Sequence, residues 1–228
     1  MSFDIRNLWV LHIGGVEIWI TETMRNTWII AGALIALAIA ARLCLKRFQD
    51  IPRGFQNVIE ALIEMFDGFV RSSAGDRLYF LGYWYFTVFA FILISNLSGM
   101  IPGMRPPTAD WGNNFAIALV TFGLIQAMGW KFRRGAYLRA IFLEPHFLFS
   151  PLNIIGEIAR PISLSFRLFG NILAGMVIMN LLYSMAPTFA LILIPSALHF
   201  YFDIFAGVLQ TYIFCVLSLT FVGIAAEE

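Results

Sequence analysis

The stretch from residue 158 to residue 179, IARPISLSFRLFGNILAGMVIM, decides how the rest of the chain is read. It is apolar and long enough to cross a bilayer, which takes about 20 residues, yet Arg167 lies in its middle. A charge near the membrane centre costs at least ~2.5–3.5 kcal/mol on insertion scales. Because a residue this costly is rarely incidental, Arg167 is the first candidate functional residue of the chain.

The composition places the whole chain in a membrane. Of its 228 residues, 60% are hydrophobic and only 13% are charged, against about 25% charged in an average soluble domain. The mean hydropathy is +0.79. We therefore predict an all-α integral membrane protein that forms a single membrane domain over residues 1–228. Cys44 and Cys215 lie in apolar stretches and are expected to be buried thiols, with no disulfide, metal site or cofactor.

The chain divides into membrane spans and two longer apolar tracts. Spans are predicted at 27–45, 79–101 and 114–130. The tracts at 148–184 and 188–226 are each roughly 55–60 Å long if wholly helical. Each is therefore either one strongly tilted helix or a pair of shorter pieces. We expect about five crossings, although hydropathy alone also allows six.

Three further segments lie outside these spans. Apolar residues at three- and four-residue spacing in 54–71, opposed by acidic ones, predict an amphipathic helix along the membrane surface. Proline and glycine in 102–113 predict an exposed loop. Acidic and basic residues interrupt any early apolar run in 1–26, so no cleavable signal peptide is expected.

Basic residues predict the orientation. Segments 42–77 and 131–139 hold ten of the fifteen Lys and Arg residues, whereas Arg105 is the only one in the loop between those segments. By the positive-inside rule both basic segments are cytoplasmic. The 1–26 segment and the 102–113 loop are then outside, and the C-terminus is cytoplasmic.

Each long tract carries polar residues on one face. In the first tract Arg160, Ser163 and Asn171 share a face with Arg167, together with the small residues Gly170, Ala174 and Gly175. In the second tract the polar residues are His199, Asp203 and Gln210, with Ala206 and Gly207 between them. Small residues permit close helix approach, so we expect the two polar stripes to pack toward each other.

Several of these residues also have ordinary structural interpretations. Arg160 can extend to the membrane interface, or Glu157 can simply pair with it one turn away. His199 is either an interhelical hydrogen-bonding group or a proton carrier, and Ser163 can bond its own backbone. Arg167 lies too far from either end of its span for such an explanation, and Asp203 ranks next because an unpaired carboxylate in lipid is costly.

The depths of these groups suggest a mechanism. Glu157 falls in the cytoplasmic half of the membrane, whereas His199 and Asp203 fall in the outer half. Acidic groups at two depths, separated by a fixed positive charge, suit two offset water paths that never join. Arginine suits that barrier because it effectively never deprotonates.

The motif RPISLSFRLFGNILAG, residues 160–175, resembles subunit a of the F-type ATP synthase. So does LQTYIFCVLSLTF at 209–221 and, more weakly, NLSGMIP at 96–102. The resemblance implies that Arg167 faces a rotating ring of c subunits, and that Asn96, Asn171 and Gln210 belong to the ion path. It also implies an outer relay role for Asp203, at a position usually occupied by His or Glu.

The resemblance leaves the coupling ion open. Met176 stands where the family often has an acidic residue, so either Asp203 carries the outer relay alone or the ion is Na⁺ rather than H⁺. The implied partners are the c-ring, the peripheral-stalk b subunits and membrane lipid, with no nucleic acid. The implied protein is a non-catalytic channel subunit of a multi-subunit ATP synthase in the cell membrane.

Two other readings compete with this one. A secondary transporter with a substrate site at Arg167 and Asp203 would usually show internal repeats, and none is evident. An intramembrane enzyme is disfavoured because the sequence has no HExxH motif, no paired catalytic acids and no Gly-rich phosphate loop.

Overall fold

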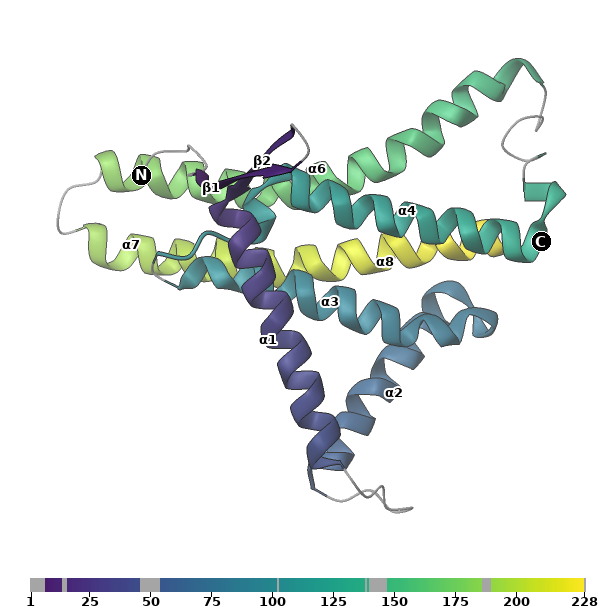
Figure 1. Cartoon of the computed structure of the whole chain (residues 1–228), viewed down its shortest axis with the longest axis horizontal. Coiled ribbons are helices and arrows are strands. Elements are labelled where there is room, and N and C mark those ends of the chain that lie inside the picture. The colour runs from purple at the N-terminus through teal and green to yellow at the C-terminus, as the bar shows by residue number, and fades with distance from the viewer. Residues whose placement is uncertain are drawn as a thin grey trace. The chain divides into compact units, whose positions relative to one another are not determined.

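The computed structural model describes residues 7–13, 16–45, 54–101, 103–137, 139, 147–185 and 190–227. Parts of the predicted segments lie outside these residues, namely residues 46–53 of the basic segment 42–77 and the starts of the 102–113 and 188–226 segments. Figure 1 traces the elements along the chain.

The fold class predicted from composition is confirmed. Among the described residues, five helices are long and apolar enough to cross a membrane: Glu22–Cys44, Asp76–Met100, Trp111–Arg133, Ser150–Met185 and Ile194–Ala226. The chain is thus a multi-pass membrane protein that is almost wholly α-helical. Cys215 is buried as expected, but Cys44 is exposed, because α1 (Glu22–Cys44) buries only Thr23, Asn26 and Ile30, near its N-terminus.

The N-terminal segment contains a hairpin that the sequence pattern did not predict. Strands β1 (Asn7–Ile13) and β2 (Val16–Thr21) pair antiparallel, and β2 leads directly into α1 (Figure 1). Thr21 caps that helix by accepting a hydrogen bond from the Met24 amide at 3.2 Å, and Glu22 lies in its positive first turn.

The remaining elements follow in order. They are α2 (Phe55–Ala74), the 3₁₀ segment η1 (Asp76–Leu81), α3 (Gly82–Leu97), η2 (Ser98–Met100), η3 (Pro107–Ala109), α4 (Trp111–Arg133) and η4 (Phe147–Phe149). The long tracts follow as α6 (Ser150–Met185), α7 (Ala190–His199), the π-helical η5 (Phe200–Ala206) and α8 (Gly207–Ala226). The first tract is one 36-residue helix that continues through Pro161. The second is helical throughout its described length but changes to π geometry in the middle.

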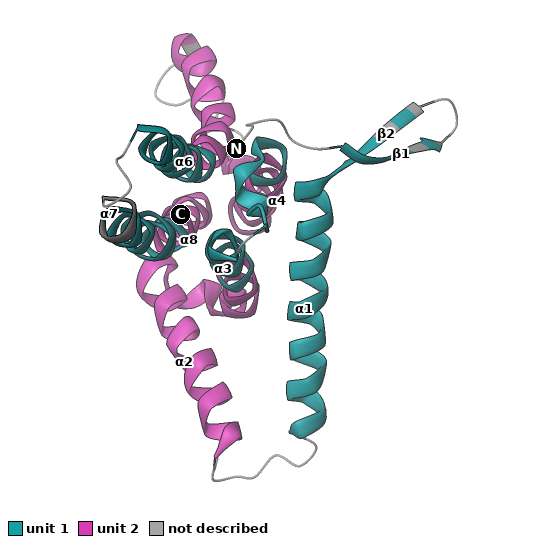
Figure 2. Cartoon of the chain, turned by 90° about the vertical axis from the view of Figure 1, so that its left-hand side faces the viewer, with its two compact units in different colours: residues 1–46, 90–114, 168–211 teal, residues 47–89, 115–167, 212–228 magenta. Residues whose placement is uncertain are grey.

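The chain forms two compact units, coloured separately in Figure 2. Unit 1 comprises Met1–Lys46, Ala90–Asn114 and Leu168–Thr211, and unit 2 comprises Arg47–Phe89, Phe115–Arg167 and Tyr212–Glu228. Four helices, α3, α4, α6 and α8, each contribute residues to both units.

Unit 1 is held together by polar contacts around the 102–113 loop, whose centre is not exposed as predicted, whereas Gly103 and Gly112 are exposed. Pro106, Pro107 and Thr108 are buried. The Thr23 hydroxyl donates to Asp110 at 2.9 Å, and the Asn26 amide donates to the Arg105 carbonyl at 2.8 Å. A loop with polar backbone groups can be buried when side chains satisfy those groups, and the side chains of Asn26, Asn113 and Asn114 do so here.

Unit 2 has an aromatic core on one side of α2. The Phe66 ring packs edge-on against Phe86 and Phe89, with centroids 5.1 and 5.3 Å apart. Val70 is fully buried. Tyr85 of α3 and Ser218 of α8 share a buried 2.7 Å hydrogen bond. The apolar side of α2 is therefore only partly available to lipid, at residues such as Phe55, Val58 and Leu62, which are exposed.

Candidate functional site

Helix α6 exposes Arg167 and buries the adjacent side of the helix. Leu164, Ser165 and Leu168 are each at most 2% exposed. Arg167 is exposed, as are the small residues on its side of the helix, Ser163, Gly170 and Ala174. In the described part of the chain, the Arg167 guanidinium makes no ion pair or hydrogen bond. Arg167, in the middle of a span, is thus exposed on a side of the helix whose other side chains are small, which allows another helix to approach closely.

Glu157 and Arg160 lie nearer the start of α6 and pair with each other. Glu157 Oε1 and Arg160 Nη1 are 2.9 Å apart, and the Arg160 guanidinium lies 5.1 Å from the Phe221 ring centroid. Gln126 Nε2 of α4 donates to Glu157 Oε2 at 3.0 Å. The pairing foreseen as one reading of Glu157 is present, and Gln126 is a partner that helical spacing did not indicate.

His199 and Asp203 form the second polar cluster, joined by Tyr183. His199 Nδ1 is 2.6 Å from Asp203 Oδ2, and the Tyr183 hydroxyl is 3.2 Å from His199 Nε2. With its proton on Nδ1, the imidazole donates to the carboxylate and accepts from the tyrosine. The three groups form a continuous hydrogen-bonded chain within unit 1. Tyr183, near the end of α6, was not identified from the sequence.

Asp203 lies in the π-helical segment η5. π-Helical turns inside α-helices are rare and frequently occur at functional sites. Each such turn contains an extra residue, so the side chains beyond it are rotated relative to those before it. This rotation explains why His199 and Asp203 are partly exposed whereas Gln210 is only 8% exposed, although spacing alone placed all three on one face.

Asn96 is the centre of a buried hydrogen-bonded network. Its Nδ2 donates to the Gly207 carbonyl at 3.0 Å and to Thr211 Oγ1 at 3.1 Å, and its Oδ1 accepts from Thr108 at 2.8 Å. One side chain therefore ties α3, the 102–113 loop and the start of α8 together. These three hydrogen bonds of the Asn96 side chain are all made to other residues of the chain.

Two other predicted residues carry buried donors. Asn171 Nδ2 and Gln210 Nε2 are inaccessible to solvent and have no hydrogen-bond partner in the described part of the chain. A buried donor without a partner costs about 1–3 kcal/mol. Both residues belong to unit 1, and the structure does not join either of them to the His199–Asp203 pair.

The expected packing of the two polar stripes against each other is wrong for most of the small residues. Gly170 and Ala174 are exposed. A Cβ on Gly207 would meet Asn96 of α3 at 3.3 Å. Gly175 does face the second tract, where a Cβ would lie 3.3 Å from the Phe202 Cβ. Helices thus approach each other closely at Gly175, against the π segment, and at Gly207, against α3. The side of α6 that carries Arg167, Gly170 and Ala174 is exposed.

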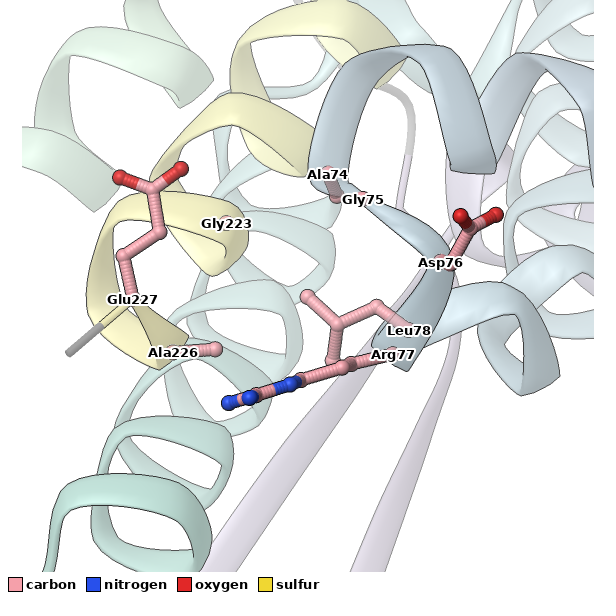
Figure 3. A pocket seen from close by; sticks show the side chains of 8 residues that line it. All are labelled: Ala74, Gly75, Asp76, Arg77, Leu78, Gly223, Ala226 and Glu227. Atoms are coloured by element: carbon pink, nitrogen blue, oxygen red, sulfur yellow. The ribbon is translucent and has the colours of Figure 1, made fainter.

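Unit 2 also contains a cavity of about 300 Å³ whose lining includes none of the residues predicted for the site. Its lining comprises Ala74, Gly75, Asp76, Arg77, Leu78, Gly223, Ala226 and Glu227 (Figure 3). In Figure 3 the Arg77 side chain extends beneath Ala226, while Asp76 points away from α8. Within the described residues, no three His, Cys, Asp or Glu side chains gather closely enough to hold a metal ion.

Comparison with known proteins gives consistent matches along almost the whole chain. Residues 24–223 match the family described as ATP synthase A chain. The chain is 35% identical over 224 residues to ATP synthase subunit a of Moorella thermoacetica, covering 96% of each protein. It is 34% identical to ATP synthase subunit a 2 of Bradyrhizobium sp., covering 98% of this chain and 96% of that protein. It is also 34% identical to the sodium ion specific ATP synthase subunit a of Propionigenium modestum, covering 89% of this chain and 73% of that protein.

Proposed function

Because the chain belongs to the ATP synthase A chain family, we propose that it is the ion-conducting stator of the membrane sector, facing a c-ring. It provides two offset half-channels that load and unload the c-subunit carboxylates, and so couples H⁺ or Na⁺ flow to ATP synthesis. The subunit is itself non-catalytic, and partner subunits carry out the nucleotide chemistry.

The observation that carries this proposal is the outward presentation of Arg167. A guanidinium in a membrane span normally pairs with another group of the protein, and Arg167 has no such partner in the described residues. The flanking Gly170 and Ala174 leave room for a second helix at the same level. An anionic group on a neighbouring helix, such as a c-subunit carboxylate, satisfies both conditions.

The polar clusters supply the two access paths. On the outer side, the chain Tyr183–His199–Asp203 is continuous over two hydrogen bonds and suits passage of a proton or a hydrated cation. On the inner side, Glu157 and Ser163 precede Arg167 on α6, at ten and four residues before it. A cation advancing along either path meets the Arg167 charge, whereas a passing carboxylate is attracted to it.

The buried amides have roles beside the arginine. Asn171 follows Arg167 by one turn of α6, and Gln210 lies in α8. Their buried N–H groups have no partner among the described residues, and a rotation of either side chain toward the ion path would let it donate to an acceptor there. We place Asn96 in the ion path as well, where its hydrogen bonds to the start of α8 would hold that helix in position.

The orientation and partners follow from charge distribution and family membership. The protein is proposed to span the cell membrane with its N-terminus outside and its C-terminus cytoplasmic, as a single membrane domain. Helix α2, with Phe55, Val58 and Leu62 exposed, would lie at the membrane surface. There it would contact lipid and the peripheral-stalk b subunits.

The test is ATP-driven ion pumping by the complete ATP synthase in vesicles, comparing wild type with Arg167→Ala. We expect pumping to be abolished while assembly stays intact. Arg139→Ala is the matched control, because Arg139 is also exposed but lies outside the spans. Unchanged pumping by an assembled Arg167→Ala complex would refute the proposal and favour a secondary transporter. Scanning Na⁺ from trace to high concentration with the wild type decides the coupling ion.

A further inference from the structure

A chain of polar side chains in unit 2 reaches Glu157 from a part of the sequence that the proposed site does not include. The Tyr137 hydroxyl donates to Gln126 Oε1 at 3.0 Å, and Gln126 Nε2 donates to Glu157 Oε2 at 3.0 Å. The other carboxylate oxygen, Oε1, pairs with Arg160 at 2.9 Å. Both oxygens of Glu157 are thus engaged, one by its own helix and one by α4.

The chemistry of the three side chains determines which group donates and which accepts in each hydrogen bond. In its ion pair with Arg160, the Glu157 carboxylate offers only acceptors. The Gln126 amide must therefore turn its nitrogen toward Glu157, which leaves its oxygen for the tyrosine hydroxyl. An aliphatic side chain at position 126 could make neither bond, and a carboxylate there would present an acceptor to an acceptor.

A glycine on α4 makes room for the tyrosine. A Cβ on Gly129 would lie 2.6–2.8 Å from Cε2, Cζ and Cδ2 of the Tyr137 ring, closer than real Cβ atoms come to other atoms. Tyr137 is only 5% exposed. Burial, and secondarily the negative charge of Glu157, raise the pKa of the Tyr137 phenol. The hydroxyl therefore remains a donor throughout the physiological pH range.

Among the described residues, few charged groups lie near the cluster formed by Tyr137, Gln126 and Glu157. Arg160 faces Glu157 from α6, and Arg133, at the end of α4, acts electrostatically on Tyr137. The element packed on the other side of Arg160 contributes the uncharged ring of Phe221. Among the described residues, the Glu157 carboxylate is thus balanced mainly by Arg160 and oriented by Gln126.

We propose that Gln126 and Tyr137 are positioning residues for Glu157, holding its carboxylate at the cytoplasmic entrance of the ion path. This inference rests on the proposed function, in which Glu157 belongs to the inner half-channel. Without the hydrogen bond from Gln126, the Glu157 carboxylate rotates about its own side-chain bonds, and the inner path loses an acceptor in a fixed position. Both residues act through Glu157, to which they are linked by hydrogen bonds.

The experiment measures ATP-driven pumping as a function of pH by the complete ATP synthase in vesicles. We expect Gln126→Leu to lower pumping about threefold to tenfold at neutral pH without loss of assembled complex. Gln126→Glu should be impaired similarly at neutral pH but should recover as the pH falls, because the introduced carboxylic acid can donate to Glu157 only when protonated. A merely structural role for Gln126 would not produce that difference in pH profile.

A pair of glycine variants tests the tyrosine. Gly129→Ala should displace the Tyr137 ring and lower ion pumping to the same extent as Tyr137→Phe, which removes the hydroxyl that donates to Gln126. Gly123→Ala is the matched control on the same helix, since nothing lies within 4 Å of a Cβ at that position. If the Gly123 and Gly129 variants pump equally, the role of Tyr137 is refuted.

The outcome is separable from that of the proposed function. Wild-type pumping and an unchanged pH profile in both Gln126 variants, alongside an inactive Arg167→Ala complex, would overturn this inference alone. Normal pumping by Arg167→Ala would remove the channel function on which the inference rests. Should Gln126→Leu fail to assemble, the acid-side recovery of Gln126→Glu decides the question by its presence or absence.

Discussion

Ser95 and Asn96 are adjacent buried polar residues for which opposite effects of truncation are expected. Ser95 is 0% and Asn96 is 1% exposed, both near the end of α3. Asn96 makes the three hydrogen bonds described above. The Ser95 hydroxyl has no partner in the described part of the chain. Comparing alanine substitutions at these two residues therefore distinguishes the contribution of hydrogen bonding to stability from the contribution of burial alone.

The expected magnitudes follow from the number of bonds. Interhelical hydrogen bonds in membrane proteins contribute about 0.6 kcal/mol each on average, and at most about 1.7. Asn96→Ala should therefore lower the free energy of unfolding by about 2 kcal/mol, with about 5 as the upper bound. Ser95→Ala should be close to neutral or slightly stabilising, because it removes a buried hydroxyl that gains no bond. A difference of about 2 kcal/mol is about 30-fold in the unfolding equilibrium.

The assay is detergent-induced dissociation and unfolding of the purified complex, measured for both variants in one titration series. Ion pumping is followed in parallel, because Asn96 also belongs to the proposed ion path. Equal destabilisation by the two substitutions would refute the reasoning. So would a greater loss with Ser95→Ala, because burial rather than hydrogen bonding would then determine the outcome.

Three other outcomes are expected. Asp203→Asn should slow ion translocation, less severely if His199 replaces it in the relay; pumping at the normal rate would exclude Asp203 from the path. Tyr85→Phe and Ser218→Ala should show a coupling of about 0.6 kcal/mol in a double-mutant cycle, since they lose the same buried 2.7 Å bond; strict additivity would contradict it. The raised pKa of Tyr137 means that the unfolded chain releases this proton first, so its contribution to stability is full below pH ~10 and falls at higher pH. Tyr137→Phe should abolish that alkaline decline in thermal stability, and an unchanged decline would show that other groups cause it.

Some structural features were predictable because they depend on local sequence alone. Hydropathy is a sum over a short window, and a window near 20 apolar residues predicts a span wherever it occurs. The pair Glu157–Arg160 was also foreseeable, because residues three apart on a helix are neighbours. The same holds for His199 and Asp203, four residues apart.

Other features depend on contacts between distant parts of the chain and could not be read from spacing. Gln126 bonds a carboxylate 31 positions away, and Tyr183 reaches His199 across a connection between helices. The 102–113 loop has the composition of an exposed loop, yet asparagine side chains donate to its backbone carbonyls and allow its centre to be buried. The π segment at Phe200–Ala206 also follows no obvious sequence signal.

What the sequence by itself determined is that the chain crosses a membrane and carries Arg167 in the middle of a span. Both conclusions follow from transfer free energies, which each residue contributes whatever its neighbours are. Only the tertiary structure decided which way that arginine faces, since burial of Leu164 and Leu168 on the adjacent side of α6 leaves Arg167 exposed. The same packing decided which polar groups meet, because a hydrogen bond requires two side chains within about 3 Å, and only the packed helices bring them that close.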